Sequence, residues 1–229
     1  MYRGNVVNFL RKAMVITRKD IISEMRTKEI IFSALLFALL VIITFNFAFG
    51  GSQEMMLLVA PGILWVTFTF AGILSLNRSF IAEKEENCLE GLMIAPISRE
   101  VIYIGKMLGS LLFMLVIEII ALPVLAFLFN LPVLSAKIIV VTLMATIGFV
   151  TVGTLFSALA VNTKAREIVL PILFLPIVVP IVISAVKASG LALSGEPWQA
   201  LAPWLNIIGA FDAIFLVVSF WVFNYIIEE

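Results

Sequence analysis

Long apolar runs separated by short polar segments dominate the hydropathy pattern of the chain. A helix needs about 20 mostly apolar residues to cross ~30 Å of hydrocarbon at 1.5 Å per residue. Six segments meet this requirement: Ile30–Phe49, Met55–Leu76, Met107–Phe129, Ile138–Val161, Ile168–Val186 and Leu205–Ile227. The pattern therefore predicts an all-α polytopic membrane protein with six transmembrane helices.

Residues 1–28 have a different periodicity from the six runs. Their apolar positions recur at helical spacing and would share one face of a helix: Val6, Leu10, Ala13, Met14, Thr17 and Ile21. Lys12 and Lys19 would project from the opposite face, which suits anionic lipid headgroups. We predict an N-terminal amphipathic interfacial helix over residues 1–28, followed by a permease domain over residues 29–229. The alternative is a short soluble cap.

The positions of lysine and arginine predict the orientation, because positively charged loops stay in the cytoplasm. With the N-terminus inside, thirteen of the fifteen basic residues would be cytoplasmic: Arg3, Arg11, Lys12, Arg18, Lys19, Arg26, Lys28, Arg78, Lys84, Arg99, Lys106, Lys164 and Arg166. Only Lys137 and Lys187 would fall outside, each at the end of a span. Both termini are therefore expected in the cytoplasm.

Composition excludes several classes of function. Apolar residues make up 62% of the chain and charged residues 13%, with no net charge, whereas soluble domains are about 45–50% apolar. There is no basic surface to attract nucleic acid. The sequence has no histidine and one cysteine, Cys88, which removes the commonest metal ligand and general base. We expect no catalytic site, no metal site and no cofactor in this chain.

Specific enzyme motifs are missing as well. The sequence lacks the phosphate-binding pattern GxxxxGK[ST], so any ATP chemistry must come from a partner. A zinc protease would need His-Glu-x-x-His, and an intramembrane aspartyl protease would need two aspartates within spans. Only Asp212 lies in a predicted span.

The longest hydrophilic stretch, residues 77–106, connects the second and third predicted spans. On a helix, its apolar positions would form one stripe with glutamates beside it, and Pro96 would end that helix. A helix of this kind can dock into a cleft on another protein. We predict that this cytoplasmic coupling loop docks a partner through Glu85, Glu86, Leu89, Glu90 and Leu92. The alternative is a solvated loop.

Two carboxylates lie inside predicted spans, Glu118 in the third and Asp212 in the sixth. A charge at membrane depth costs several kcal/mol, so each side chain should face protein or a cavity, or carry a proton. A substrate contact or a proton relay would use such a group. The alternative is a protonated side chain hydrogen-bonded to a neighbouring helix.

Small residues, prolines and tryptophans indicate how the spans pack. Pairs at four-residue spacing in the fourth span, Thr142/Thr146 and Gly153/Ser157, permit close helix contact. Pro171, Pro176 and Pro180 invite kinks in the fifth span. The stretch from Leu191 to Trp204 is expected to form a short helix or re-entrant element at the outer surface.

Two stretches of the sequence resemble a known family. The second span contains Ala60-Pro61-Gly62-Ile63-Leu64-Trp65-Val66, followed by Leu89-Glu90-Gly91-Leu92-Met93 and then Pro96. The fifth span contains Leu175-Pro176-Ile177-Val178-Val179-Pro180. These runs resemble the CcmB family, the membrane subunit of the haem exporter of cytochrome c maturation. The acidic loop with a later lysine, here Lys106, is shared by type 2 ABC exporter permeases in general.

The resemblance implies a permease subunit in the bacterial inner membrane that works with several partners. The ATPase CcmA would bind ATP and Mg and dock on the coupling loop, CcmC and CcmD would complete the complex, and the haem chaperone CcmE would be released. Two copies of the permease per complex are expected, with haem held by partner proteins. The alternatives are an exporter permease for a lipid, glycan or drug, and a non-transporting scaffold for cytochrome assembly.

Overall fold

The computed structural model describes residues 2–49, 52–85, 98–160 and 166–226. This part of the chain folds into seven helices: α1 (Tyr2–Thr27), α2 (Glu29–Phe49), α3 (Gln53–Glu85), α5 (Arg99–Phe129), α6 (Ala136–Ala160), α7 (Arg166–Leu193) and α8 (Trp198–Ile226). Six of them are long and apolar enough to cross a membrane, and α1 is not among these six. The predicted all-α, six-span architecture is confirmed.

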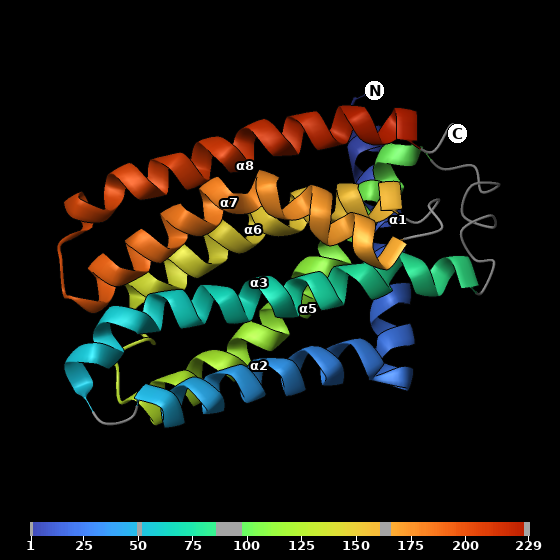
Figure 1. Cartoon of the computed structure of the whole chain (residues 1–229). Helices are drawn as coiled ribbons and strands as arrows, with labels where there is room; N and C mark the ends of the chain where they lie inside the picture. The colour runs from blue at the N-terminus through green and yellow to red at the C-terminus, as the bar shows by residue number, and fades with distance from the viewer. Residues whose placement is uncertain (1, 50–51, 86–97, 161–165, 227–229) are drawn as a thin grey trace.

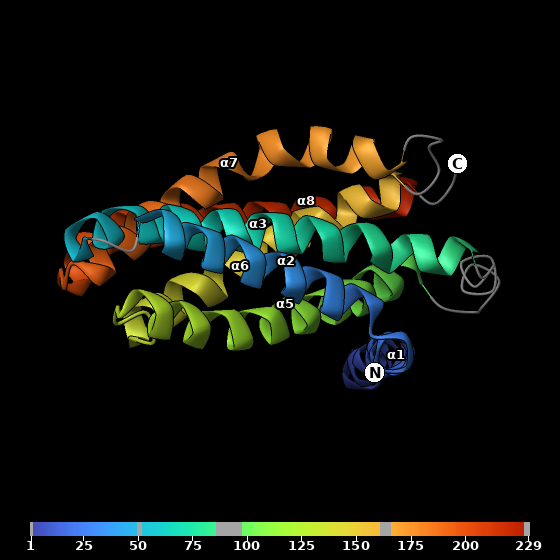
Figure 2. The ribbon, with the colours of Figure 1, turned by 60° about the horizontal axis from the view of Figure 1, so that its bottom comes forward.

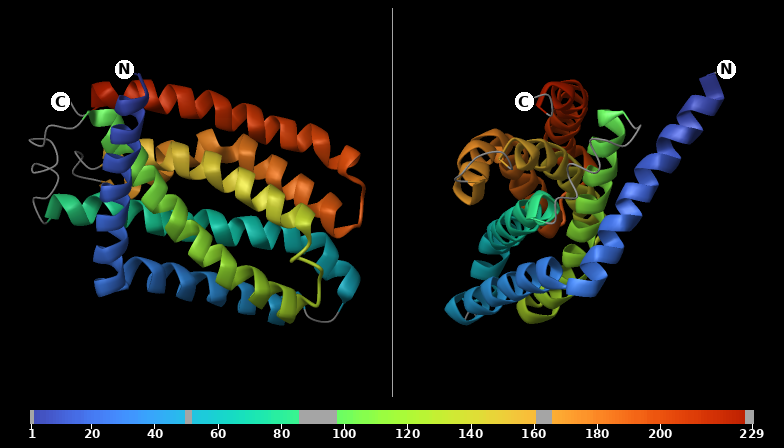
Figure 3. Two further views of the ribbon diagram at one scale, coloured as in Figure 1. Left: turned by 180° about the vertical axis from the view of Figure 1, so that it is seen from behind. Right: turned by 90° about the vertical axis from the view of Figure 1, so that its right-hand side faces the viewer.

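Helices α2 to α8 run alongside one another as a bundle, and α1 lies across one end of it (Figures 1 and 2). The end view in Figure 3 shows α1 crossing the bundle beside α5 and α2. Here, "the α1 end" means this end of the bundle, and "the far end" means the other. The outside of the bundle carries large apolar side chains, among them Phe47, Phe127 and Trp221, which are 84%, 85% and 71% exposed. A surface of this kind suits lipid.

Helix α6 is the most buried of the six spans, and it contacts α3, α5, α7 and α8. The predicted pair Gly153/Ser157 packs against α3. Ser157 donates a hydrogen bond to the backbone oxygen of Leu76 at 2.7 Å, and the Leu76 side chain occupies the space that a Cβ at Gly153 would need. Close contact at a small residue is a common way for helices to associate in membranes.

Several helices are longer than the apolar runs predicted. Helix α3 has 33 residues and continues to Glu85, about 50 Å at 1.5 Å per residue. Helix α5 begins at Arg99 rather than Met107, and α7 remains helical through its three prolines. Hydropathy marks where a helix meets lipid, and a helix does not have to end there.

The predicted outer element between Leu191 and Trp204 is wrong. Helix α7 continues through Gly190 to Leu193, and α8 already begins at Trp198, so the two helices are joined by a turn in which Gly195 has φ +81°. A glycine within a helix costs only about 1 kcal/mol relative to alanine. Gly190 lies against Pro61 of α3, whose Cγ would be 3.7 Å from an added Cβ.

Different helix ends and turns lie at the two ends of the bundle (Figure 1). The α1 end holds the last turn of α3, the first turn of α5, the start of α7 and the end of α8. At the far end, Lys137 of α6 donates a hydrogen bond to the backbone oxygen of Glu196 in the α7–α8 turn at 2.6 Å.

Candidate functional site

Helix α1 packs on the bundle with a face that overlaps only partly with the apolar stripe seen in the sequence. Among residues 9–27 of this helix, the buried ones are Ala13, Ile16, Thr17, Asp20 and Glu24. The predicted stripe is split, because Ala13 and Thr17 are buried whereas Leu10 and Met14 are 46% and 60% exposed. The exposed apolar side chains of α1 are therefore available to lipid, while a narrower polar face meets protein.

Two glycines of α5 determine which face of α1 is buried. A Cβ at Gly105 would lie 2.8 Å from Cβ of Ile16 and 3.0 Å from the backbone oxygen of Ala13, so no larger residue fits. A Cβ at Gly109 would lie 3.4 Å from Oδ2 of Asp20. Gly105 and Gly109 form a Gly-x-x-x-Gly pattern, which allows close helix approach in membrane proteins. The four-residue spacing was visible in the sequence but was not recognised there.

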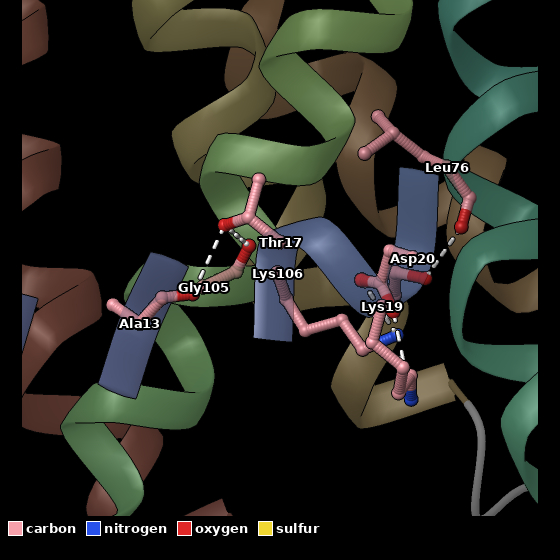
Figure 4. Close-up of polar contacts among 8 residues, drawn as sticks. Ala13, Thr17, Lys19, Asp20, Leu76, Gly105 and Lys106 are labelled. Carbon is pink, nitrogen blue, oxygen red and sulfur yellow. Dashed lines mark hydrogen bonds and ion pairs between the residues drawn. The ribbon is translucent and has the colours of Figure 1, made fainter. Parts of the chain in front are cut away.

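Polar contacts connect α1 to α5 at the same place (Figure 4). The hydroxyl of Thr17 lies 2.9 Å from the backbone oxygen of Gly105 and 3.1 Å from that of Ala13. Nζ of Lys106 lies 3.1 Å from Oδ2 of Asp20. Nζ of Lys19 lies 3.5 Å from the other carboxylate oxygen. We call the contact of Ala13, Thr17 and Asp20 with Gly105, Lys106 and Gly109 the α1–α5 joint.

The ion pair in this joint is buried on both sides. The side chain of Lys106 is 1% exposed and that of Asp20 is 8% exposed, whereas Lys19 is 43% exposed. A buried lysine or aspartate without a partner is strongly destabilising, about 3–5 kcal/mol when one partner of a buried pair is removed. The Asp20 carboxylate thus has two lysines beside it, and its pair with Lys106 is the one that is buried on both sides.

A second buried carboxylate of α1 connects it to α2. Glu24 is 4% exposed, and its Oε1 accepts a hydrogen bond from the backbone N–H of Ile31 at 2.9 Å. That N–H is one of the unpaired donors in the first turn of a helix, and a carboxylate there also interacts favourably with the helix dipole. Between the two helices, Lys28 adopts a left-handed conformation, with φ +58°. Glu24 and Lys28 thus define the angle between α1 and α2.

One of the predicted docking residues, Glu85, falls at this same end. Glu85 is the last residue of α3, and Glu86, Leu89, Glu90 and Leu92 lie outside the described residues. Helix α3 ends and α5 begins at the α1 end (Figure 1). The joint begins only six residues after Arg99, at Gly105.

The two intramembrane carboxylates are both buried, but on different sides of α6. Oε1 of Glu118, whose side chain is 2% exposed, accepts a hydrogen bond from the hydroxyl of Thr146. Asp212 is 9% exposed, and its carboxylate lies directly over Gly148. Thr146 and Gly148 are two positions apart on one helix and point in nearly opposite directions. The structure therefore does not bring Glu118 and Asp212 together.

The motif Ala60-Pro61-Gly62 and the following Trp65 form a packing contact between α3 and α7. Ala60 and Pro61 are buried, and Pro61 lies against Gly190. The indole N–H of Trp65 donates to the hydroxyl of Ser189 at 3.0 Å. Gly62, by contrast, has open space where a side chain would begin. This motif lies in the half of the bundle away from α1 and contributes to the fold rather than to the α1 end.

Comparisons with known proteins match most of the chain. The family described as CcmB protein matches residues 11–228. The chain is 30% identical to the heme exporter protein B of Bradyrhizobium diazoefficiens over 203 residues, which cover 88% of this chain and 90% of that protein. It is 33% identical to the Rhodobacter capsulatus protein of the same name over 165 residues, 69% of this chain and 76% of the relative. For the Escherichia coli K12 protein the identity is 29% over 190 residues, 76% and 78% of the two chains. The chain belongs to the CcmB family.

Proposed function

We propose that this chain is the membrane permease subunit of a haem exporter complex that serves cytochrome c maturation. The observation that carries the proposal is the family match over residues 11–228, together with relatives named heme exporter protein B. The six-span bundle is consistent with a polytopic membrane permease.

ATP hydrolysis is assigned to a partner ATPase, CcmA, which docks at the α1 end. Two observations support this end as the cytoplasmic one. Arg11, Arg18 and Arg26 of α1 lie there, whereas Lys137 and Lys187 lie toward the far end. Because basic residues remain cytoplasmic, we expect both termini on the cytoplasmic side of the bacterial inner membrane. ATP and Mg are bound by CcmA, whose contact residues on this chain are Glu85, Glu86, Leu89, Glu90 and Leu92.

The role of this subunit is mechanical. The sequence has no histidine, so a haem site here would have to use methionine, cysteine or tyrosine. Met56 and Met114 are 4% and 2% exposed within the apolar core, and the hydroxyl of Tyr103 donates to the backbone oxygen of Thr151. The family resemblance assigns haem ligation to CcmC and the chaperone CcmE, and we infer that this subunit, present in two copies and assembled with CcmD, transmits the motion that ATP drives.

Docking is tested by charged substitutions in the coupling loop. Leu89→Asp with Leu92→Asp should abolish co-purification of CcmA while the chain still inserts into the membrane. Leu134→Asp is the matched control, because Leu134 is 54% exposed in the α5–α6 connection at the far end. Retention of CcmA by the double variant would contradict the docking assignment.

Two alternative functions are separated from this one by the composition of the complex. A permease for a lipid, glycan or drug would purify with an ATPase but without haem proteins. A non-transporting scaffold would purify with haem proteins but would not stimulate ATP hydrolysis. The complex is therefore isolated from native membranes, its protein partners are identified, and its ATPase rate is measured with and without this subunit.

A further inference from the structure

Stabilisation of helix packing does not by itself explain why the α1–α5 joint contains buried charges. Lys106 is among the largest fully buried side chains of the described residues. Well-packed apolar side chains often stabilise a contact as well as a buried ion pair or better. In this joint, displacement of either helix would separate the charges of Lys106 and Asp20, so the ion pair favours one arrangement of α1 on α5.

The neighbouring contacts restrict the joint further. Ile16 leaves no space for a side chain at Gly105, the hydroxyl of Thr17 bonds the backbone oxygen of Gly105, and Asp20 lies over Gly109. These contacts span one turn of α5 and two turns of α1. Sliding or rotation of α1 on α5 would break them together with the ion pair. The first turns of α5 and the middle of α1 are therefore expected to move as one body.

The same body includes the start of α2. Glu24, one turn after Asp20 on α1, accepts the hydrogen bond from Ile31 N–H of α2. A continuous path thus connects the beginning of α5, through Lys106 and Asp20, to Glu24 and the first turn of α2 (Figure 4 shows its first part).

We propose that Asp20 and Lys106 are a positioning pair that makes α1 and α2 follow α5 when the docking loop between α3 and α5 moves. This inference rests on the proposed function, because it assumes that the ATPase acts on that loop. Neither residue is assigned contact with haem or nucleotide. Their role is to convert displacement of α5 into displacement of α1 and α2.

The first experiment removes the charge of one partner in the whole complex. Asp20→Asn should leave CcmA bound and hydrolysing ATP, while the haem delivered per ATP falls about tenfold, within the usual range of coupling between sites. Lys137→Met is the control, because it removes a lysine contact at the far end. Unchanged haem delivery per ATP in Asp20→Asn would overturn the proposal.

The second experiment replaces the ion pair with a covalent bond. Cβ of Asp20 lies 3.6 Å from the Cβ position of Gly109, within the 3.5–4.5 Å separation of disulfides, about 3.8 Å on average. The variant Asp20→Cys/Gly109→Cys also carries Lys106→Met, so that no unpaired charge remains, and Cys88→Ser, so that no other thiol competes. Haem delivery per ATP should be low when the bond is reduced and restored when it is oxidised. Loss of delivery on oxidation would show that α1 must move on α5, and equal delivery in both states would show that the joint transmits nothing; either result overturns the proposal.

The wild-type complex separates this inference from the function on which it rests. Absence of ATP-dependent haem delivery by the wild type would contradict both. Delivery by the wild type with no effect of Asp20→Asn or of the disulfide would contradict the positioning pair alone.

Discussion

Trp65 of α3 donates its indole N–H to the hydroxyl of Ser189 in α7, across 3.0 Å and within the buried interior of the bundle. The two residues are 124 positions apart in the sequence. Their contact, together with Pro61 against Gly190, joins the second and fifth spans. It explains in structural terms why a tryptophan stands in the motif that suggested the family.

Trp65→Phe should lower stability modestly, because it keeps most of the apolar contact and loses the hydrogen bond. A hydrogen bond between membrane helices contributes about 0.6 kcal/mol on average. Trp65→Ala should cost about 3–5 kcal/mol, since it also leaves a cavity. Unfolding of the detergent-solubilised chain measures both effects. If the bond to Ser189 is the reason for the Trp65→Phe effect, Ser189→Ala should produce a loss of similar size, and Trp65→Phe should add little to it.

Gly148→Ala should destabilise the bundle although alanine is the better helix former. An added Cβ would collide with the carboxylate of Asp212 and lie 2.6 Å from Cδ1 of Ile181. Overpacking of this kind costs about 1–3 kcal/mol. Gly62→Ala is the matched control, because no atom lies within 4 Å of its Cβ position, so the change should be neutral or stabilising. The midpoint of thermal unfolding of the two variants distinguishes them, and equal midpoints would contradict the close contact.

Glu118→Gln should leave both assembly of the complex and haem delivery at the wild-type level. Glutamine keeps an oxygen that can accept the hydrogen bond of Thr146 and removes the possibility of a charge. Glu118→Ala should lower stability by about 1–2 kcal/mol, because it removes the partner of a buried hydroxyl. Haem delivery and the midpoint of unfolding are both measured for each variant. Loss of delivery in a stable Glu118→Gln complex would instead favour a proton relay at this position.

Anionic lipid should stabilise the contact of α1 with the membrane. Arg11 and Arg18 are exposed on α1, on the side that also carries exposed apolar residues such as Met14 and Val15. Each basic residue near an anionic surface contributes about 1 kcal/mol. In nanodiscs, replacing neutral with anionic lipid should raise the unfolding temperature of the wild type more than that of Arg11→Gln/Arg18→Gln. Lys187→Gln, toward the far end, should respond like the wild type, and an equal response of all three would contradict the interfacial position of α1.

The sequence predicted the architecture well because membrane insertion depends on local hydropathy. Each of the six runs is apolar enough to form a span whatever its neighbours are, and each appears as a helix. The close packing at Gly153 and Ser157 also followed from a spacing within one helix. The ends of the helices were harder to predict from the sequence. Helices α5 and α7 extend beyond their apolar stretches for reasons of packing rather than hydropathy.

The site at the α1 end was only partly predictable for the same reason. That residues 2–27 form an amphipathic helix is evident from their periodicity, but which face is buried depends on Gly105 and Gly109, some ninety residues away. The docking residues from Glu86 onward lie outside the described part of the chain and remain predictions. The sequence likewise did not identify the hydrogen-bond partner of Glu118, which is the hydroxyl of Thr146.

The sequence by itself thus determined the number of spans, the helical class and the segregation of basic residues, because these follow from properties of consecutive residues. Only the tertiary structure decided that Asp20 pairs with Lys106, that Glu24 meets the first turn of α2, and that Trp65 meets Ser189. Such pairings arise where distant helices approach closely enough for particular side chains to fit. The separation of two residues along the chain does not predict whether they come into contact.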